Sequence, residues 1–239
     1  MRIAAIIPVG TLEGAKTRLG GTLDAEERHD LVEGLLARTV ATALAVDRLD
    51  DVLVISPDPE VLTRAAEIGA RTVRQRTSGL NAGLAEARAD VIAGGAEALL
   101  VLPIDLPFVT AEAVSALLEP LIEAPEGTHV VLATDRHGTG TNALGLRPPD
   151  VIDFAFGPGS RLAHRAATEA VGATYTEVGG PLTVDLDTPE DLVFVEAAES
   201  AESAESAGAA RPAGATEPPE AAEPTDPAVA AEAERLRVG

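Results

Sequence analysis

The chain has 239 residues, of which 46% are hydrophobic and only 2% aromatic, and its net charge at pH 7 is −21. This length allows one domain of roughly 200 residues with an aliphatic core, plus an appendage. The lack of cysteine excludes disulfides and thiolate metal sites, and the acidic balance argues against binding to nucleic acid or to an anionic membrane. There is no apolar run of roughly 18 residues and no signal-peptide pattern, so we expect a cytoplasmic protein.

Apolar runs and helical patterns alternate along most of the chain. In chain order they predict a strand at 2–9, a helix at 25–46 capped by Asp24, a strand at 51–56, a helix at 59–68, a strand at 71–74, a helix at 81–93, a strand at 97–102, a helix from Thr110 to about 121, strands at 130–133 and 143–146, a helix at 160–171, a strand at 174–178 and a last helix at 189–199.

This alternation is typical of an α/β fold, in which helices cover both faces of a mostly parallel central sheet. The loops at the carboxyl ends of the strands then form the ligand site. We assign residues 1–199 to this domain. Residues 200–239 consist of Ala-Glu-Ser repeats and a Pro/Ala/Glu stretch that cannot bury enough apolar surface to fold, so we expect an acidic, disordered tail.

The loop after the first strand contains Lys16, the only lysine in a chain whose other 17 basic residues are arginine. It is not a P-loop, because Ala15 separates Gly14 from Lys16 and two adjacent glycines soon follow where a helix should begin. The glycine spacing does not fit a dinucleotide fingerprint either. With Arg18 close by, the loop favours a cradle for a triphosphate, and a solvated surface loop is the alternative.

Two carboxylates follow strands or precede helices. Asp105 stands between two prolines after the strand at 97–102, and Asp187 precedes the last helix in a segment that also contains Asp185. Each has a simpler interpretation: Asp105 is a turn residue or a helix cap, and Asp187 or Thr188 caps the helix that Pro189 starts. Converging at one edge of the sheet, the two would hold Mg²⁺ against phosphate oxygens. An acidic protein needs such cations to bind an anionic substrate.

A glycine-rich turn precedes the helix that begins near Ser160. Its exposed N–H groups and the helix dipole favour an anion, and the basic residues Arg161 and Arg165 and the imidazole of His164 follow closely in the sequence. A plain helix cap is the alternative. The other three histidines show no metal-ligand spacing, and we expect them at the surface.

Two further polar residues have two interpretations each. Thr141, in a loop of small polar residues between two strands, either lines the pocket or belongs to an ordinary turn. Asn81, near the start of a helix, either contacts the base or ribose of a nucleotide or caps the helix.

Several of these segments occur together in a recognisable order. They are Ile7-Pro8-Val9, Ala15-Lys16-Thr17-Arg18-Leu19, Gly79-Leu80-Asn81, Asp105-Leu106-Pro107, Thr141-Asn142-Ala143-Leu144, Phe156-Gly157-Pro158-Gly159-Ser160 and Asp185-Leu186-Asp187-Thr188-Pro189-Glu190-Asp191-Leu192. Over about residues 1–195 the chain resembles the guanylyltransferases of coenzyme F-420 biosynthesis, which act on phosphoenolpyruvate or 2-phospho-L-lactate. Single segments are shared with the wider nucleotidyltransferase superfamily, including the molybdenum-cofactor enzymes.

The resemblance implies a Rossmann-like nucleotidyltransferase fold with GTP as co-substrate and Mg²⁺ as cofactor. It also implies roles: Lys16 and Arg18 hold the GTP phosphates and act in catalysis with Asp105; Asp105 and Asp187 bind magnesium; Asn81 lies near the nucleotide; Thr141, Gly157 and Ser160 bind the acceptor. One departure is Gly10, where the family commonly has lysine.

The expected reaction is attack by the acceptor's phosphate on the α-phosphorus of GTP, with release of pyrophosphate. The first loop is closer to the bacterial members, which favours phosphoenolpyruvate. The partners are small molecules, with no nucleic acid and no membrane; the oligomeric state stays open, a homodimer included. The alternatives are another nucleotidyltransferase, for a molybdopterin or a sugar phosphate, and a non-catalytic nucleotide-binding regulator.

Overall fold

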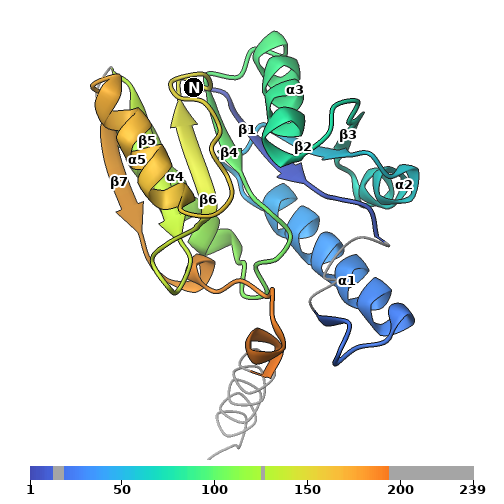
Figure 1. Ribbon diagram of the computed structural model, residues 1–239. Coiled ribbons are helices and arrows are strands. Elements are labelled where there is room, and N and C mark those ends of the chain that lie inside the picture. The colour runs from blue at the N-terminus through green and yellow to red at the C-terminus, as the bar shows by residue number, and fades with distance from the viewer. Residues whose placement is uncertain (13–18, 125–126, 194–239) are drawn as a thin grey trace, which may run out of the picture. The chain divides into compact units, whose positions relative to one another are not determined.

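A seven-stranded sheet runs through the part of the chain that the computed structural model describes, residues 1–12, 19–124 and 127–193 (Figure 1). The strand order is β3-β2-β1-β4-β6-β5-β7. The strands are β1 (Ile3–Pro8), β2 (Asp51–Ser56), β3 (Arg71–Arg74), β4 (Ala98–Val101), β5 (His129–Thr134), β6 (Thr141–Arg147) and β7 (Thr174–Val178). All neighbours are parallel except that β6 runs antiparallel to β4 and β5. The predicted mostly parallel sheet is confirmed.

Helices cover both faces of this sheet. They are α1 (Ala25–Leu44), α2 (Pro59–Ile68), α3 (Leu80–Ala93), α4 (Ala111–Glu123) and α5 (Ser160–Ala170). Alternate residues of the central strand β1 point to opposite sides, with Ile3, Ala5 and Ile7 in one apolar cluster and Ala4 and Ile6 in the other. The first cluster contains residues of α1, α2 and α4, and the second contains residues of α3. Figure 1 shows the resulting layers. Strands buried on both faces explain why the sequence reads as continuous apolar runs.

Side-chain caps predicted from the sequence are present at the starts of α1 and α4. The Asp24 side chain accepts hydrogen bonds from the backbone of Glu26 and Glu27 in a capping box, and the Thr110 hydroxyl accepts one from Ala113 N–H. The predicted element boundaries agree with the observed ones to within two residues from the first strand to β7. The last predicted helix is present over residues 189–193; its predicted end and the tail over 200–239 lie outside the described residues.

The chain order places a change of direction in the middle of the sheet. From β1 the chain moves outward through β2 and β3, then crosses back to add β4 on the other side of β1. In a doubly wound sheet this point opens a crevice at the carboxyl ends of the two central strands, where ligands bind. None of the helices in the described ranges is long and apolar enough to cross a membrane.

Candidate active site

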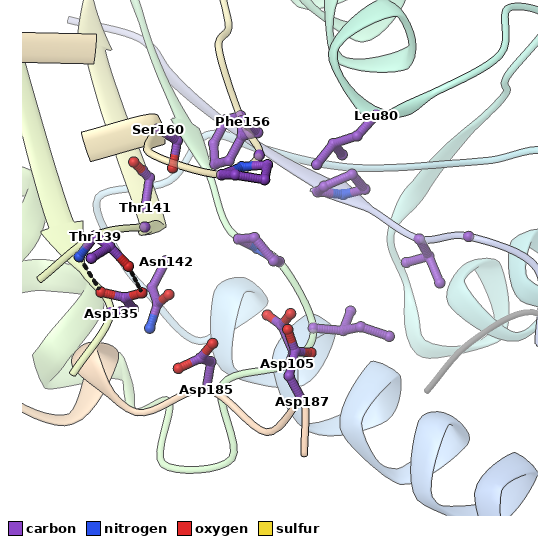
Figure 2. A pocket seen from close by; sticks show the side chains of 18 of the residues that line it. Leu80, Asp105, Asp135, Thr139, Thr141, Asn142, Phe156, Ser160, Asp185 and Asp187 are labelled. Carbon is purple, nitrogen blue, oxygen red and sulfur yellow. Dashed lines mark hydrogen bonds between the residues drawn. The ribbon is translucent and has the colours of Figure 1, made fainter. Parts of the chain in front are cut away.

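A pocket of about 830 Å³ opens at the carboxyl ends of β1 and β4 (Figure 2). This volume lies within the usual range for small-molecule sites. Segments from distant parts of the sequence line it: Pro8–Thr11, the start of α3, Pro103–Asp105, the β5–β6 connection, the turn before α5, and Asp185 with Asp187. The loops singled out from the sequence therefore meet in one cavity.

The loop after β1 leaves the sheet beside β2. The Ser56 hydroxyl donates to the carbonyl of Gly10 at 3.2 Å, and the N–H of Leu12 donates to the Asp58 carboxylate at 3.1 Å. A Cβ on Gly10 would meet no atom within 4 Å, so the described surroundings leave room for a side chain there. Lys16 and Arg18 lie outside the described residues, and their predicted contacts with GTP phosphates stay predictions.

Three carboxylates share one wall of the pocket. Figure 2 shows Asp105 and Asp187 together, with Asp185 beside them. A backbone hydrogen bond of 2.9 Å from Leu186 N–H to the carbonyl of Asp105 joins the two segments that carry them. Burial raises the pKa of Asp185, and the negative charges of Asp105, Asp187 and Asp191 raise it further. The predicted convergence of Asp105 and Asp187 is present, and Asp185 joins them.

Asp185 belongs to a segment singled out from the sequence, but no role was predicted for it. The missed signal is the spacing. Residues 184–187 have neither helix nor turn, and Leu186 between the two aspartates is 1% exposed. In an extended segment, residues two apart point to the same side, so a buried Leu186 predicts that Asp185 and Asp187 face the pocket together.

The Asp191 carboxylate binds the backbone of the segment that carries Asp185 and Asp187. One carboxylate oxygen, Oδ2, accepts hydrogen bonds from the N–H of Asp187 at 3.0 Å and from the N–H and hydroxyl of Thr188, both at 2.8 Å. The other, Oδ1, forms an ion pair with Arg136. Burial opposes ionisation of Asp191, but these hydrogen bonds and the Arg136 charge outweigh it and hold its pKa below the usual range. The cap of the last helix is therefore Thr188, not Asp187: the Thr188 hydroxyl accepts from Asp191 N–H at 3.3 Å, and the Asp191 carboxylate accepts from Thr188 N–H in return.

The opposite wall presents hydroxyl groups. Figure 2 shows Thr141, at the start of β6, next to Ser160, at the start of α5, and Gly157 is also part of the lining. Ser160 is 2% exposed, and none of the hydrogen bonds between described residues uses its hydroxyl. The predicted meeting of Thr141, Gly157 and Ser160 is present. Their contact with an acceptor stays a prediction.

The expected anion site at the α5 terminus differs from its prediction in two respects. The first two helix amides are already used, because Ser160 N–H donates to the carbonyl of Gly157 at 3.0 Å and Arg161 N–H donates to that of Thr139 at 3.3 Å. The basic side chains turn elsewhere: Arg161 binds Glu177, and Arg165 binds Glu169. The basic side chains are therefore not the donors on this wall, where the hydroxyl groups of Thr141 and Ser160 line the pocket.

Asn81 does not cap α3. Its N-cap residue is Gly79, with a φ of 88°, and there is no side-chain cap. The Asn81 carboxamide instead makes two hydrogen bonds to the backbone of Phe156, one from Nδ2 to the carbonyl at 3.0 Å and one from Phe156 N–H to Oδ1 at 2.9 Å. Residue 81 therefore ties the start of α3 to the turn before α5. A direct contact of Asn81 with nucleotide stays a prediction.

The described part of the pocket is strongly acidic. Its lining includes Asp105, Asp135, Asp185 and Asp187, and no lysine or arginine from the described ranges. Within those ranges no group of three or more His, Cys, Asp or Glu side chains forms a ready-made metal site. An anionic ligand therefore needs positive charge that it brings with it or that the 13–18 segment supplies.

The chain also matches known proteins along this whole domain. Residues 3–202 match the family model described as "Guanylyl transferase CofC like". The phosphoenolpyruvate guanylyltransferase of Rubrobacter xylanophilus is 45% identical over 199 residues, which are 83% of this chain and 95% of the relative. That of Sphaerobacter thermophilus is 43% identical over 194 residues, 80% of this chain and 91% of the relative.

Solved structures extend the likeness to the fold. A putative nucleotide-diphospho-sugar transferase from Desulfovibrio desulfuricans G20 superposes with a TM-score of 0.64 at 18% identity, over 80% of this chain and 85% of that one. The 4-diphosphocytidyl-2C-methyl-D-erythritol synthase of Anaerococcus prevotii gives 0.56 at 14% identity, over 83% and 96%. This is a Rossmann-like transferase fold, and, with a family model matched across nearly all of the domain, the chain belongs to the CofC-like guanylyl transferase family.

Proposed function

We propose that this protein joins the guanylyl group of GTP to phosphoenolpyruvate, giving enolpyruvyl-diphospho-5'-guanosine and pyrophosphate, as a cytoplasmic step in coenzyme F-420 biosynthesis. The observation that carries the proposal is the single pocket in which carboxylates after β4 and before the last helix face the hydroxyls of Thr141 and Ser160. The choice of acceptor rests on the relatives, which are named for phosphoenolpyruvate.

Magnesium fits the donors on the acidic wall. Mg²⁺ prefers carboxylate oxygens, and in nucleotide sites it uses one or two of them and takes further ligands from phosphates and water. Asp105 and Asp187 would hold it, with Asp185 beside them. Burial is the main cause of the raised pKa of Asp185, and the neighbouring negative charges, which a cation would neutralise, raise it further. When bound, the ion supplies positive charge to the phosphate oxygens of GTP.

The residues of the chain position the two substrates for a direct transfer. An oxygen of the acceptor's phosphate attacks the α-phosphorus of GTP in line, the new phosphorus–oxygen bond forms, and the bond to the β-phosphate oxygen breaks. Pyrophosphate leaves with that electron pair. A phosphate monoester is already largely ionised near pH 7, so the attacking oxygen needs no general base. Thr141, Gly157 and Ser160 would hold the acceptor, and Lys16 and Arg18 the phosphates of GTP.

A direct assay tests this reaction. The full chain with GTP, Mg²⁺ and phosphoenolpyruvate should release pyrophosphate in step with loss of GTP, and chelation of Mg²⁺ should abolish the release. Parallel reactions with 2-phospho-L-lactate, and with CTP in place of GTP, fix the acceptor and the base. Pyrophosphate from neither acid would disprove the proposal, and GTP binding with no turnover under any of these conditions would favour a nucleotide-binding regulator.

Gly10 offers a gain-of-function test at the position where the family commonly has lysine. Among the described residues nothing lies within 4 Å of a Cβ at this position, and the Gly10 backbone is not in the left-handed region that only glycine adopts easily. In Gly10→Lys we expect the KM for GTP to fall by about 3- to 10-fold, since a lysine here adds a charged donor for phosphate. Gly10→Ala, which adds only the Cβ, is the matched control and should stay within about twofold. A higher KM for GTP in Gly10→Lys alone would show that this position does not face the phosphates.

A further inference from the structure

His164 is a fully buried histidine one helical turn after Ser160. Its ring lies behind the hydroxyl wall of the pocket, with 0% of the residue exposed. Ser160, His164 and Thr168 form the buried face of α5, so this face is polar where a helix normally packs with apolar residues. A buried imidazole is costly unless both nitrogens are hydrogen-bonded, and here both are.

The partners of the two ring nitrogens determine which one carries the proton. Nε2 lies 3.0 Å from the backbone nitrogen of Ala155, which can only donate, so Nε2 must accept. Burial lowers the pKa of His164 to about 4, so the ring is neutral at pH 7. In a neutral imidazole the other nitrogen then carries the hydrogen. Nδ1 therefore donates to the hydroxyl oxygen of Thr141, 3.0 Å away.

The orientation of the ring is also constrained by packing. The Phe156 ring stands edge-on to it, with centroids 5.1 Å apart and planes at 72°. A half-turn of the imidazole would place ring carbons where Ala155 N–H and the Thr141 hydroxyl now find nitrogens. The packing therefore fixes the plane of the ring, and the two hydrogen bonds fix which way round it lies and which tautomer it adopts.

This arrangement fixes the direction in which the Thr141 hydroxyl can donate. Its oxygen accepts a hydrogen bond from His164, and among the hydrogen bonds between described residues this is the one its side chain makes. The hydroxyl hydrogen is thus left for the pocket, which Thr141 lines beside Ser160. We propose that His164 is a positioning residue that holds the Thr141 hydroxyl as a donor toward an anionic oxygen of the phosphorylated acceptor. This inference rests on the proposed function, since the acceptor is the ligand that this hydroxyl would meet.

Two substitutions separate the two hydrogen bonds of the His164 ring, the one it accepts from Ala155 and the one it donates to Thr141. The side-chain oxygen of glutamine in His164→Gln can take the place of Nε2 and accept from Ala155, but the donor to Thr141 is lost. In His164→Asn the amide nitrogen takes the place of Nδ1 and keeps that donor. We expect His164→Gln to raise the KM for phosphoenolpyruvate about tenfold with the KM for GTP unchanged. His164→Asn should recover most of this loss. A purely structural role predicts no such preference for asparagine and similar changes in both KM values.

A double-mutant cycle tests the route through Thr141. Thr141→Val removes the hydroxyl with little change of shape and should raise the same KM. Combined with His164→Gln, it should cause no further increase, because the two residues act through one hydrogen bond. Additive effects, or a normal acceptor KM in Thr141→Val, would overturn the proposal. His129→Gln is the matched control: His129 is also buried and bonded to a threonine, Thr176 at 2.9 Å, but it lies at the opposite end of β5 from the pocket.

A measurement that needs no turnover tests the role of His164 independently of the proposed reaction. Nitrogen-15 NMR of the histidine side chains, with His164 assigned through the His164→Gln spectrum, should show a neutral ring protonated at Nδ1 at pH 7. A ring protonated at Nε2, or a charged ring, would overturn the proposal even in an active enzyme. If the wild type makes no pyrophosphate, the proposed function fails. The KM comparison is then replaced by the affinity for phosphoenolpyruvate, measured by calorimetry on the same variants. Equal affinity in wild type and His164→Gln would then overturn the inference.

Discussion

Asp105→Asn is expected to reduce pyrophosphate release from GTP and phosphoenolpyruvate by about a hundred- to a thousandfold while the protein stays folded. The change keeps the shape of the side chain and removes its charge. If Asp105 holds Mg²⁺ against GTP, the substitution weakens binding of the ion and so removes positive charge that stabilises the phosphate during transfer. Such electrostatic stabilisation is usually the largest contribution to the rate of a phosphoryl-transfer reaction. The measurements are kcat with saturating substrates and the thermal unfolding midpoint.

The control for Asp105→Asn is Asp150→Asn, which removes the same charge from an exposed residue outside the pocket lining. It should retain kcat within about twofold, as is usual for surface changes. An Asp105→Asn enzyme with normal turnover would remove Asp105 from the metal site and return it to its simpler interpretation as a turn residue.

Asp191→Ala is expected to lower the free energy of unfolding by about 3 kcal/mol, since it removes the carboxylate that accepts from part-buried N–H groups of Asp187 and Thr188 and that pairs with Arg136. For a domain of this size the unfolding midpoint should fall by about 6 to 12 °C. Turnover should fall as well at temperatures where the variant is folded, because the backbone of Asp187 loses its support. Thermal unfolding and kcat report the two effects.

Asp191→Asn separates the two oxygens of this carboxylate. An asparagine can keep the acceptor for Asp187 and Thr188 while it turns an amide toward Arg136, so its loss should be smaller than that of alanine. The pKa of Asp191 is lowered in the folded protein, so its contribution to stability is present above the ordinary aspartate range and is lost as the pH falls through the folded value. Equal midpoints for wild type and Asp191→Ala at pH 7 would contradict this account.

The fold could be predicted because its central strands are buried on both faces and three of its helices, α1, α2 and α4, carry side-chain caps. Runs such as residues 52–55 are apolar throughout, and Asp24 and Thr110 mark helix starts by local hydrogen bonds. The order of the strands could not be predicted the same way. The insertion of β6 between β4 and β5 depends on which strand pairs with which across the sheet, and the residue pattern of each strand alone does not specify this.

The site was predicted best where a residue type has one main use and worst where a side chain has several possible partners. Asp105 follows a buried strand and Asp187 precedes the last helix, and the two converge because the topology brings both segments to one end of the sheet. Arg161 and Arg165 were expected near an anion. Arg161 instead pairs with Glu177 on β7, which only the fold brings near, and Arg165 pairs with Glu169 one helical turn further along, an i,i+4 pair that the sequence already offers. His164 was singled out together with those arginines. His129 was expected at the surface, and this prediction was wrong, since His129 is only 8% exposed.

The pair of hydrogen bonds between Asn81 and Phe156 has a consequence for how the two substrates affect each other. One carboxamide spans from the α3 side of the cavity to the turn that leads into α5. In the proposed enzyme a ligand that shifts either segment also shifts the other through these hydrogen bonds. Binding of GTP should therefore change the affinity for phosphoenolpyruvate. Thermodynamic reciprocity then requires the acid to change the affinity for GTP by the same factor.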